Sequence, residues 1–391
     1  MKIFFPKWNG IGHEDMTDAF LSLGHTIDSF PFAEKDSNEE LMYAKLEQAI
    51  KVSAPDCVFS IYYFPVIAKA CFSLGIPYLS WTYDSPYVRF YHYSLSYPTN
   101  YVFVFDSAVF SEFYCGGIKN VYYLPMAANV ERLKKLNDFA SFNNTDLANQ
   151  HPISFVGSLY TESKHNFFDR MENISEYTKG FLNGLMDAQK EIYGDNFVQR
   201  ILENHPDIIK EMISAYDLGK NPDGIETDAY MYAQYMINRK ITSIERTEQL
   251  SLLGEKYGLD LYTFNKDLKV DGCTNHGPVD YFDGAPYVFK QSKINLNISL
   301  RSIINGIPLR CFEIMGSGGF LLTNFQSDFL NHFVPEEDFV YYESNKDLLD
   351  KTEYYLKNEN ERKEIALNGL KKIEAEHTYV HRAQEILSYI S

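Results

Sequence analysis

The residues with the most informative chemistry lie in the segment from Ser292 to Asn324. A strand pattern ends there at Ile298, a Gly-Ile-Pro turn follows, and Pro308 is typical of the first turn of a helix. The start of a helix has free N–H groups and the positive end of the helix dipole, so it can hold a diphosphate. Arg310 adds a planar fork of hydrogen-bond donors in the same turn.

Glu313 lies three residues after Arg310, on the same face of the predicted helix. Its carboxylate could accept hydrogen bonds from the two hydroxyls of a ribose, which with the anion site predicts a place for a nucleoside diphosphate. Residue types alone favour a different interpretation, an ordinary ion pair between Arg310 and Glu313 on a solvated helix face. Both interpretations stay open at this point.

A second candidate phosphate contact follows the first strand of the second half of the chain. Gly157 and Ser158 would let backbone N–H groups approach a phosphate, and Lys164 could reach the same charge. The alternative is an ordinary glycine between a strand and a loop. The strand expected at 259–264 ends toward the same face, which makes Thr263 a candidate for the nucleobase pocket.

Near the N-terminus, the run Gly10-Ile-Gly12-His13 follows the first predicted strand. It is not a dinucleotide-binding loop, because Asp15 stands where the third glycine belongs. Glu14 and Asp15 also place negative charge at the helix start, where a pyrophosphate would have to bind. We instead expect the short glycine loop to let a sugar or another substrate approach the backbone closely at Gly12, with His13 as a catalytic-site contact to it.

Asp84 and Asp106 follow two consecutive predicted strands. A carboxylate at such a position could orient an acceptor hydroxyl or take its proton. Asp106 precedes a serine and a helical run, which is typical of a helix N-cap, so Asp84 is the predicted catalytic residue. Neighbouring aromatic residues could stack on an acceptor sugar or belong to the core: Tyr83, Tyr87, Phe90, Tyr91, Tyr93 and Tyr97.

The sequence predicts no metal site and no cofactor. No Asp-x-Asp occurs, and the one helical histidine pair, His377 and His381, lies among acidic residues of an amphipathic helix, which indicates a solvated face. There is no serine nucleophile elbow, no P-loop and no zinc-like cysteine spacing. The predicted chemistry is therefore metal-independent.

A strand, turn and helix rhythm in the first 130 residues predicts a parallel sheet covered by helices on both faces. The strands expected in this domain are Lys2–Phe5, His25–Phe30, Asp56–Ile61, Pro77–Thr82, Tyr101–Phe105 and Val121–Leu124. The expected helices are Glu14–Leu23, Asn38–Val52, Pro65–Leu74 and Ser107–Cys115.

A polar linker is expected at 131–152, followed by a second α/β domain at 153–375 with a helical insertion over about 162–257. The strands expected in this domain are Ile153–Gly157, Leu259–Phe264, one near Val279–Phe282, Ile294–Ile298, Phe320–Thr323 and Phe339–Tyr342. The helix at 376–391 could pack back on the first domain. The predicted fold class is α/β, with two doubly wound domains and a ligand cleft between them.

Composition excludes several classes of partner. Lys and Arg total 36 against 53 Asp and Glu, and the net charge of −17 argues against nucleic acid or an anionic membrane as main partner. Five scattered cysteines indicate buried thiols in a reducing compartment. With no apolar run of about 20 residues and no signal-like N-terminus, we expect a cytoplasmic location and no membrane span.

The segment around Arg310 resembles the C-terminal domain of the group 1 glycosyltransferases of the spore maturation protein type. That domain has a strand, a loop, an Arg-x-x-(aromatic)-Glu pattern, a glycine-rich turn and an apolar strand ending in Thr. The matching runs are Lys293–Asn297, Arg310–Glu313 and Gly316–Thr323, with further likeness at Ser327–Phe329, at Phe339–Tyr342 and in the helix that holds His377. The resemblance covers Gly277 to the end, extends to Ile153–Tyr160, and is weaker over Ser80–Pro86.

The resemblance implies a GT-B enzyme with two Rossmann-like domains, the donor nucleotide being held mainly by the second. It implies a hexosyltransferase that moves a sugar from a nucleoside diphosphate sugar to a glycan, peptide or small-molecule acceptor, while oligomerisation stays open. Related enzymes often carry a glutamate eight positions before the ribose-binding one, and Asn305 stands there. Asn305 is thus expected to contact the donor sugar without a negative charge. A nucleotide-sugar epimerase and a non-catalytic nucleotide-sugar-binding protein are the alternatives.

Overall fold

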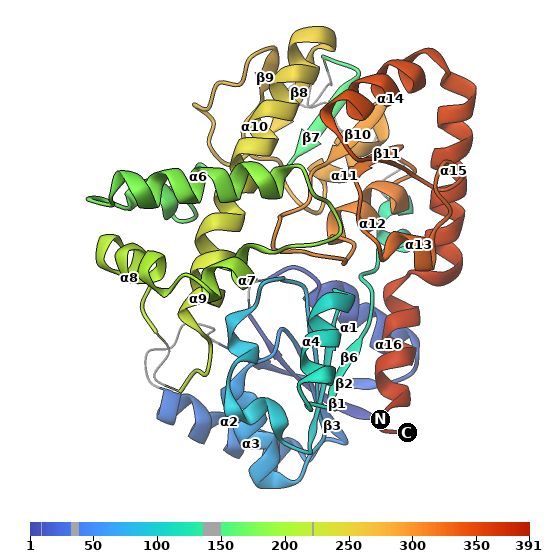
Figure 1. The fold of residues 1–391 in the computed structure, drawn as a ribbon. Coiled ribbons are helices and arrows are strands. Elements are labelled where there is room, and N and C mark those ends of the chain that lie inside the picture. The colour runs from blue at the N-terminus through green and yellow to red at the C-terminus, as the bar shows by residue number, and fades with distance from the viewer. Residues whose placement is uncertain (9, 33–38, 136–149, 221–222) are drawn as a thin grey trace. The chain divides into compact units, whose positions relative to one another are not determined.

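The computed structural model describes residues 1–8, 10–32, 39–135, 150–220 and 223–391. The chain forms two compact units (Figure 1). Unit 1 comprises Met1–Ala127, Lys220–Glu226 and His377–Ser391, and unit 2 comprises Ala128–Gly219 and Thr227–Glu376. The sequence places the domain boundaries near 130 and 375, and the predicted linker at 131–152 lies largely outside the described residues.

The sheet of unit 1 has six parallel strands in the order β2-β1-β3-β4-β5-β6. The two central strands, β3 and β4, are buried along their whole length, as expected for a parallel sheet with both faces covered. The strand bounds are β1 Lys2–Lys7, β2 Thr26–Pro31, β3 Cys57–Ile61, β4 Tyr78–Thr82, β5 Asn100–Val104 and β6 Val121–Tyr123.

Helices cover both faces of this first sheet. α2 (Glu39–Ser53), α3 (Pro65–Leu74) and α4 (Ser107–Cys115) share one apolar cluster with the strands. α1 (His13–Ser22) and α16 (Tyr379–Ser388) pack against each other, and their aromatic contacts reach other strand side chains. These contacts are Phe20 with Phe59, Trp81 with Tyr379, and Phe103 with Tyr389.

Hydrogen bonds also hold α16 within unit 1. The Arg382 side chain is buried, and its Nε donates to the Pro125 carbonyl at 2.8 Å while Nη2 donates to the Met126 carbonyl at 3.1 Å. Nη2 of Arg382 also donates to His377 Nδ1 at 2.6 Å. Two short 3₁₀ helices, Val88–Phe90 and Tyr93–Ser96, lie between β4 and β5.

The sheet of unit 2 also has six parallel strands, in the order β12-β11-β10-β7-β8-β9. Their bounds are β7 Ile153–Val156, β8 Leu259–Tyr262, β9 Cys273–Asn275, β10 Ile294–Asn297, β11 Leu321–Asn324 and β12 Val340–Tyr342. The predicted fold class, two doubly wound α/β domains, is confirmed.

The strand predicted near Val279–Phe282 is wrong. Asp280 accepts backbone N–H groups from Phe282 and Asp283, both at 2.8 Å, which closes a turn just before helix α11 (Gly284–Gln291). The third strand of this series is β9, six residues earlier in the chain. Side-chain hydrogen bonding of an aspartate to its own backbone therefore outweighs the strand preference of the aromatic residues around it.

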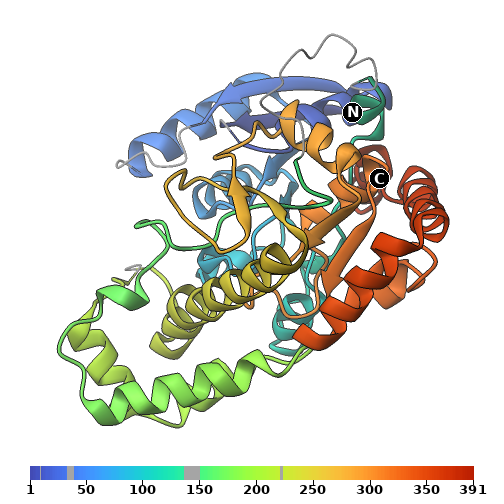
Figure 2. The same ribbon diagram turned by 90° about the horizontal axis from the view of Figure 1, so that it is seen from above.

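The segment between β7 and β8 is helical, as its polar amphipathic pattern predicts. Leu182, Met186, Leu202, Met212 and Ile237 belong to an apolar cluster of its own. Figure 2 shows these helices, coloured green to yellow, to one side of the second sheet. They are a 3₁₀ turn at Phe168–Arg170, α6 Glu176–Lys190, α7 Val198–Glu203, α8 Pro206–Ala215, α9 Asp228–Tyr232, a π-helical turn at Ala233–Ile237 and α10 Asn238–Tyr257.

Helices also cover both faces of the second sheet. α10 and α14 (Asn345–Lys357) pack on one face, and α11 and α12 (Leu309–Gly316) pack on the other. The remaining helices are α5 Val130–Lys135, α13 Phe329–His332 and α15 Glu359–Glu376. Within the described ranges, no helix has the length and apolar character needed to cross a membrane.

Candidate functional site: the carboxyl edge of the second sheet

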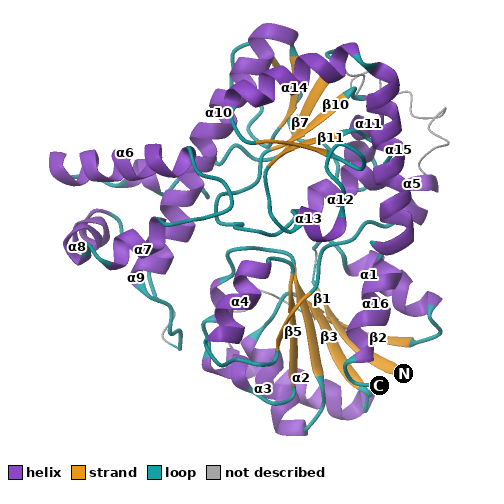
Figure 3. Ribbon diagram, turned by 45° about the vertical axis from the view of Figure 1, so that its right-hand side comes forward, coloured by secondary structure: helices purple, strands orange, loops and turns teal. Residues whose placement is uncertain are grey.

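The strand order of unit 2 reverses between β7 and β10. The chain runs from β7 outward through β8 and β9, then returns to the other side of β7 as β10. At such a switch point the loops after the two strands diverge, and ligands of doubly wound sheets bind there. Figure 3 shows the loops after these strands and helix α12 at one end of the sheet.

Helix α12 begins at Leu309, with Pro308 as its N-cap rather than in its first turn. The Pro308 side chain provides no cap, and the Cys311 N–H donates to the Pro308 carbonyl at 3.0 Å. The N–H groups of Leu309 and Arg310 have no acceptor within the helix, as is usual in a first turn. The Arg310 guanidinium donates from Nη1 to the Val156 carbonyl at 3.2 Å, which joins α12 to the end of β7. The start of α12 therefore lies beside the β7 loop, as the diphosphate hypothesis requires.

Arg310 and Glu313 form the ion pair that the alternative interpretation expects, with 3.3 Å between Nε and Oε2. The pair is not on a solvated face, however, because the Glu313 side chain is only 9% exposed and that of Arg310 is 28% exposed. An inward-facing carboxylate beside a partly exposed guanidinium is compatible with both a ribose contact and a phosphate contact. The ion pair therefore does not exclude the functional interpretation.

The loop after β7 differs in one respect from the sequence expectation. The Gly157 N–H donates to the Tyr262 carbonyl at 2.9 Å, so it belongs to the sheet and is not available to a phosphate. The Ser158 hydroxyl donates to Glu162 at 2.7 Å and accepts the Tyr160 N–H at 2.9 Å. Tyr160 has a φ of 57°, which is uncommon for a residue with a bulky side chain.

A cation that the sequence analysis misses lies against this loop. Arg246 of α10 is buried, and its guanidinium donates to the carbonyls of Ser158 and Ile298, at the ends of β7 and β10. Burial lowers the pKa of Arg246, and the nearby Arg310 lowers it further. One signal in the sequence could have revealed it. Arg246 lies four and seven residues before the core residues Leu250 and Leu253, a spacing that puts an arginine on the buried face of the helix.

The end of β8 brings two further predicted residues to the same edge. Thr263 is buried, and its hydroxyl oxygen has no hydrogen-bond partner among the described residues. Lys164 is exposed, and its ammonium lies 5.1 Å from the ring centroid of Phe264. Phe264 is itself 63% exposed, so an aromatic face and an unmatched hydroxyl lie where the sequence predicts the nucleobase.

Asn305 lies in the loop that leads from β10 to α12. Its backbone carbonyl accepts the Asp328 N–H at 3.1 Å, and the residue is half-buried. The predicted donor residues of unit 2 therefore converge on one sheet edge: Gly157, Ser158, Lys164, Thr263, Asn305, Arg310 and Glu313.

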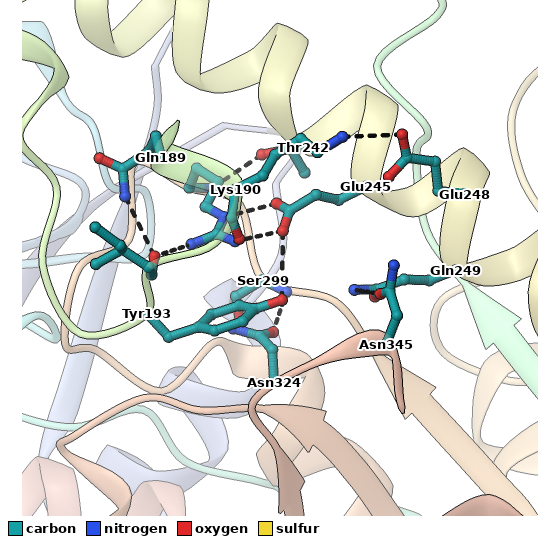
Figure 4. A network of polar contacts seen from close by, with 12 residues as sticks. Gln189, Lys190, Tyr193, Thr242, Glu245, Glu248, Gln249, Ser299, Asn324 and Asn345 are labelled. Carbon is teal, nitrogen blue, oxygen red and sulfur yellow. Dashed lines mark hydrogen bonds and ion pairs between the residues drawn. The ribbon is translucent and has the colours of Figure 1, made fainter. Parts of the chain in front are cut away.

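A buried polar network anchors the same β10 loop to α10 (Figure 4). Arg301 donates from Nε to Glu245 at 2.6 Å, and its backbone N–H donates to the Thr242 hydroxyl at 2.9 Å. Its guanidinium also lies 4.2 Å from the ring centroid of Tyr193. Because Arg301 is matched by a carboxylate, this network is structural and holds the loop in place.

Unit 1 presents different groups at the corresponding edge of its sheet. His13 begins α1, is buried, and contacts the Gly10 carbonyl through Nδ1 at 3.0 Å, while Nε2 has no hydrogen-bond partner among the described residues. Its ring packs on Phe5 and Trp8. Burial lowers the pKa of His13, which favours the neutral form of the imidazole.

Gly12 lies against the side chain of Tyr83, the residue before Asp84. Gly12 has a φ of 87°, and a Cβ built there would lie 2.6 Å from the Tyr83 hydroxyl oxygen. Asp84, the next residue, is exposed. Asp106 accepts the Ala108 N–H at 3.0 Å as the N-cap of α4, so that structural prediction is confirmed.

The aromatic run after Asp84 divides between core and surface. Phe90 is buried in the apolar cluster of unit 1, whereas Tyr93 is 51% exposed. Tyr83 and Tyr87 each pack against Tyr62, at ring-centroid distances of 6.2 and 5.4 Å. The core interpretation therefore holds for Phe90, and an acceptor-binding role for the others stays a prediction.

No group of three residues that could hold a metal ion occurs within the ranges that the structure describes. The expectation that His377 and His381 lie on a solvated face is wrong. His377 is buried against Arg382, and His381 completes a capping box with Thr378 at the start of α16. Both histidines are therefore structural, because one is a buried partner of an arginine and the other satisfies helix N–H groups.

A family model matches the C-terminal part of the chain. Residues 238–388 match the family model described as glycosyl transferase-like, a range that contains Arg246, Asn305, Arg310 and Glu313. Because this range is less than half of the chain, it identifies a glycosyl transferase-like region rather than the family of the whole protein. No curated protein matches the sequence.

Solved structures are similar over the whole chain. A glycosyltransferase from Rickettsia africae has a TM-score of 0.52 at 12% identity, covering 100% of this chain and 97% of its own. Anabaena HepE in complex with UDP-glucose has a TM-score of 0.55 at 11% identity, with coverages of 100% and 99%. Sucrose-phosphate synthase from Thermosynechococcus elongatus has a TM-score of 0.54 at 11% identity, with coverages of 100% and 98%. At these identities the likeness shows the fold, which is GT-B.

Proposed function

We propose that this protein is a glycosyltransferase that moves a sugar from a nucleoside diphosphate sugar to an acceptor. The observation that carries the proposal is the arrangement at the carboxyl edge of the second sheet. There the uncapped start of α12, the Arg310 guanidinium and the inward-facing Glu313 carboxylate lie together. The glycosyl transferase-like match over 238–388 and the UDP-glucose complex of HepE support this assignment.

In this proposal the acceptor oxygen forms a bond to the anomeric carbon of the sugar. The bond from that carbon to the diphosphate breaks, and its electron pair leaves with the nucleoside diphosphate. Charge on the leaving group is stabilised by the start of α12 and by Arg310, without a metal ion or cofactor. Asp84 orients the acceptor hydroxyl or takes its proton, and His13, Gly12 and Asn305 contact the donor sugar.

The finer assignments are part of the same proposal. We assign the protein to the hexosyltransferases of the spore maturation protein type and place it in the cytoplasm. The donor nucleotide is held by Ser158, Lys164, Thr263, Arg310 and Glu313, and Gly157 only shapes the loop beside it. The Ser158 contact runs through its main chain or hydroxyl, since the Gly157 N–H is used by the sheet.

The test is turnover of a panel of UDP, GDP and dTDP sugars, with and without glycan, peptide and small-molecule acceptors. Sugar transfer is the expected result, and it should persist in EDTA. Loss of transfer in EDTA that Mg²⁺ or Mn²⁺ restores would contradict the metal-independent mechanism. Interconversion of the donor sugar without an acceptor would indicate an epimerase.

One observation favours a second candidate, a non-catalytic nucleotide-sugar-binding protein. Asn305 offers a neutral amide where related enzymes often have a glutamate, so it cannot supply negative charge near the reacting sugar. Donor binding without turnover on the whole panel would support this candidate. A melting-temperature series with UDP, GDP and dTDP identifies the base in either case, since a ligand that binds only the folded state stabilises it.

A further inference from the structure

Two buried arginines of unit 2 have opposite electrostatic surroundings. Both Arg246 and Arg301 are 8% exposed. Arg301 forms a buried ion pair with Glu245, which neutralises its charge. Arg246, the next residue after Glu245, forms no ion pair with a carboxylate of the described residues. A buried charge without a counter-charge destabilises a fold, so its presence needs an explanation.

The contacts of Arg246 are all with neutral groups. Nε donates to the Ile298 carbonyl at 3.0 Å, Nη2 donates to the same oxygen, and Nη1 donates to the Ser158 carbonyl. The guanidinium also lies 5.4 Å from the ring centroid of Phe155 and 5.0 Å from that of Tyr160. Carbonyl oxygens and ring faces stabilise a cation only in part, and Glu245, which also raises the pKa of Arg246, is already paired with Arg301.

The position of Arg246 gives this charge a use. The carbonyls it holds follow β7 and β10, the two strands that form the switch point of the sheet. Arg310 donates to the Val156 carbonyl, so the two guanidinium groups hold carbonyls on either side of Gly157. Nη1 of Arg246 lies 3.9 Å from the place that a Cβ of Gly157 would occupy. Two cations thus flank one loop at the predicted diphosphate position.

We propose that Arg246 is a second diphosphate-binding cation of the donor site, and that the bound diphosphate is its counter-charge. This inference rests on the proposed function. A guanidinium has five N–H groups. Arg246 donates one from Nε and one from each terminal nitrogen to carbonyls, which leaves one N–H on each terminal nitrogen for a phosphate oxygen. Its guanidinium also links the loops after β7 and β10, because it donates to a carbonyl of each.

The test compares binding of a nucleoside diphosphate with binding of its nucleoside. UDP and uridine are titrated into wild-type protein and into Arg246→Gln, with GDP or dTDP and their nucleosides used instead if those bind better. We expect the substitution to lower UDP affinity about 10- to 50-fold and to leave uridine affinity unchanged. Lys256→Gln is the matched control, because it removes an exposed cation from the far end of α10, where Lys256 pairs with Glu353.

Arg246→Lys is titrated in parallel, in case the glutamine variant does not fold. An ammonium cannot hold both carbonyls and also present a fork to the diphosphate, so a several-fold loss of UDP affinity at constant uridine affinity is expected. An unchanged ratio of UDP to uridine affinity in a folded Arg246 variant would overturn the inference and leave the proposed function intact. Failure of wild-type protein to bind any of the three nucleoside diphosphates would instead overturn the proposed function.

Discussion

In unit 2, Arg246 of α10 and Arg310 of α12 donate to carbonyls at the ends of β7 and β10, whereas the corresponding edge of unit 1 has aromatic rings and an imidazole. Arg246 and Arg310 flank the β7 loop. In unit 1, Trp8 follows β1 and packs on Tyr62, which follows β3, with ring centroids 5.5 Å apart. Both sheets are parallel and doubly wound, although their strand orders differ, so the residues that reach these loops decide what each edge can bind.

The helices that follow the switch points show the same contrast. α1 of unit 1 carries Glu14 and Asp15 in its first turn, whereas α12 of unit 2 has no acidic residue in its first turn and carries Arg310 there. An anion is stabilised at a helix start only if nearby charges do not repel it. We therefore assign the diphosphate to unit 2, and the acceptor contact and the donor-sugar contacts of His13 and Gly12 to unit 1.

The largest expected effect on nucleotide affinity comes from substituting Arg310, the partly exposed arginine at the carboxyl edge of the second sheet. Arg310→Ala should lower the affinity for the nucleoside diphosphate by about 3 kcal/mol, roughly 100-fold, because charge and hydrogen bonds are both lost. Arg310→Lys keeps the charge and should lose less. Titrations and melting curves of both variants decide the matter. A lower melting temperature with unchanged affinity would show that Arg310 only pairs with Glu313.

Glu313→Ala should have the next largest effect, and one of a different kind. It removes ribose hydrogen bonds worth about 1–3 kcal/mol, so affinities for the nucleoside and for its diphosphate should fall together. Substitution of either arginine should instead affect only the diphosphate. Titration of UDP and uridine into the folded variant measures this. Unaltered uridine affinity would reject the assignment of Glu313 to the ribose.

Substitution of Gly12 probes the unit 1 edge. Gly12→Ala places a methyl group 2.6 Å from the Tyr83 hydroxyl oxygen and must displace that ring, so sugar transfer should fall about tenfold or more while nucleotide affinity stays constant. Gly24→Ala is the matched control, because Gly24 has a similar φ of 80° and no atom within 4 Å of the added carbon. If both variants transfer sugar equally well, the close approach at Gly12 has no role.

The smallest expected effect is on stability and concerns the neutral histidines. Burial lowers the pKa of His13, His92 and His165. In the unfolded chain the pKa of each of these histidines returns to about 6.5. Near and below that pH the unfolded state therefore binds more protons than the folded state. The free energy of unfolding should therefore decrease as the pH falls from 7 to 5. Urea titrations should show a smaller decrease for His13→Gln, and an equal decrease would contradict the burial of a neutral His13.

Most of the fold could be predicted from the sequence because apolar strands and glycine-ended helices are local signals. α3 and α4 have their predicted bounds, and Gly75 ends α3 in the left-handed conformation. The strand predicted near Val279–Phe282 was wrong because a side-chain turn at Asp280 competes with the strand preference of aromatic residues. Its replacement, β9, has only three residues and no apolar run to reveal it.

The candidate site could be predicted only where its residues lie close in sequence. Arg310 and Glu313 share one helix turn, and their spacing is visible in the chain. Arg246 lies 88 residues after the Ser158 carbonyl it holds, and only the folded sheet brings them together. Local patterns could not show that the Gly157 N–H belongs to the sheet either, since its acceptor, Tyr262, lies on another strand.

The central claim is that the second sheet binds the diphosphate of the donor. A crystal structure of the protein with whichever of UDP, GDP and dTDP raises its melting temperature most tests this claim directly. We expect phosphate oxygens within about 3 Å of Arg310 and of the first N–H groups of α12, with the ribose at Glu313. A diphosphate bound instead at Gly10–Gly12 of unit 1, with Arg310 still paired only to Glu313, would contradict it.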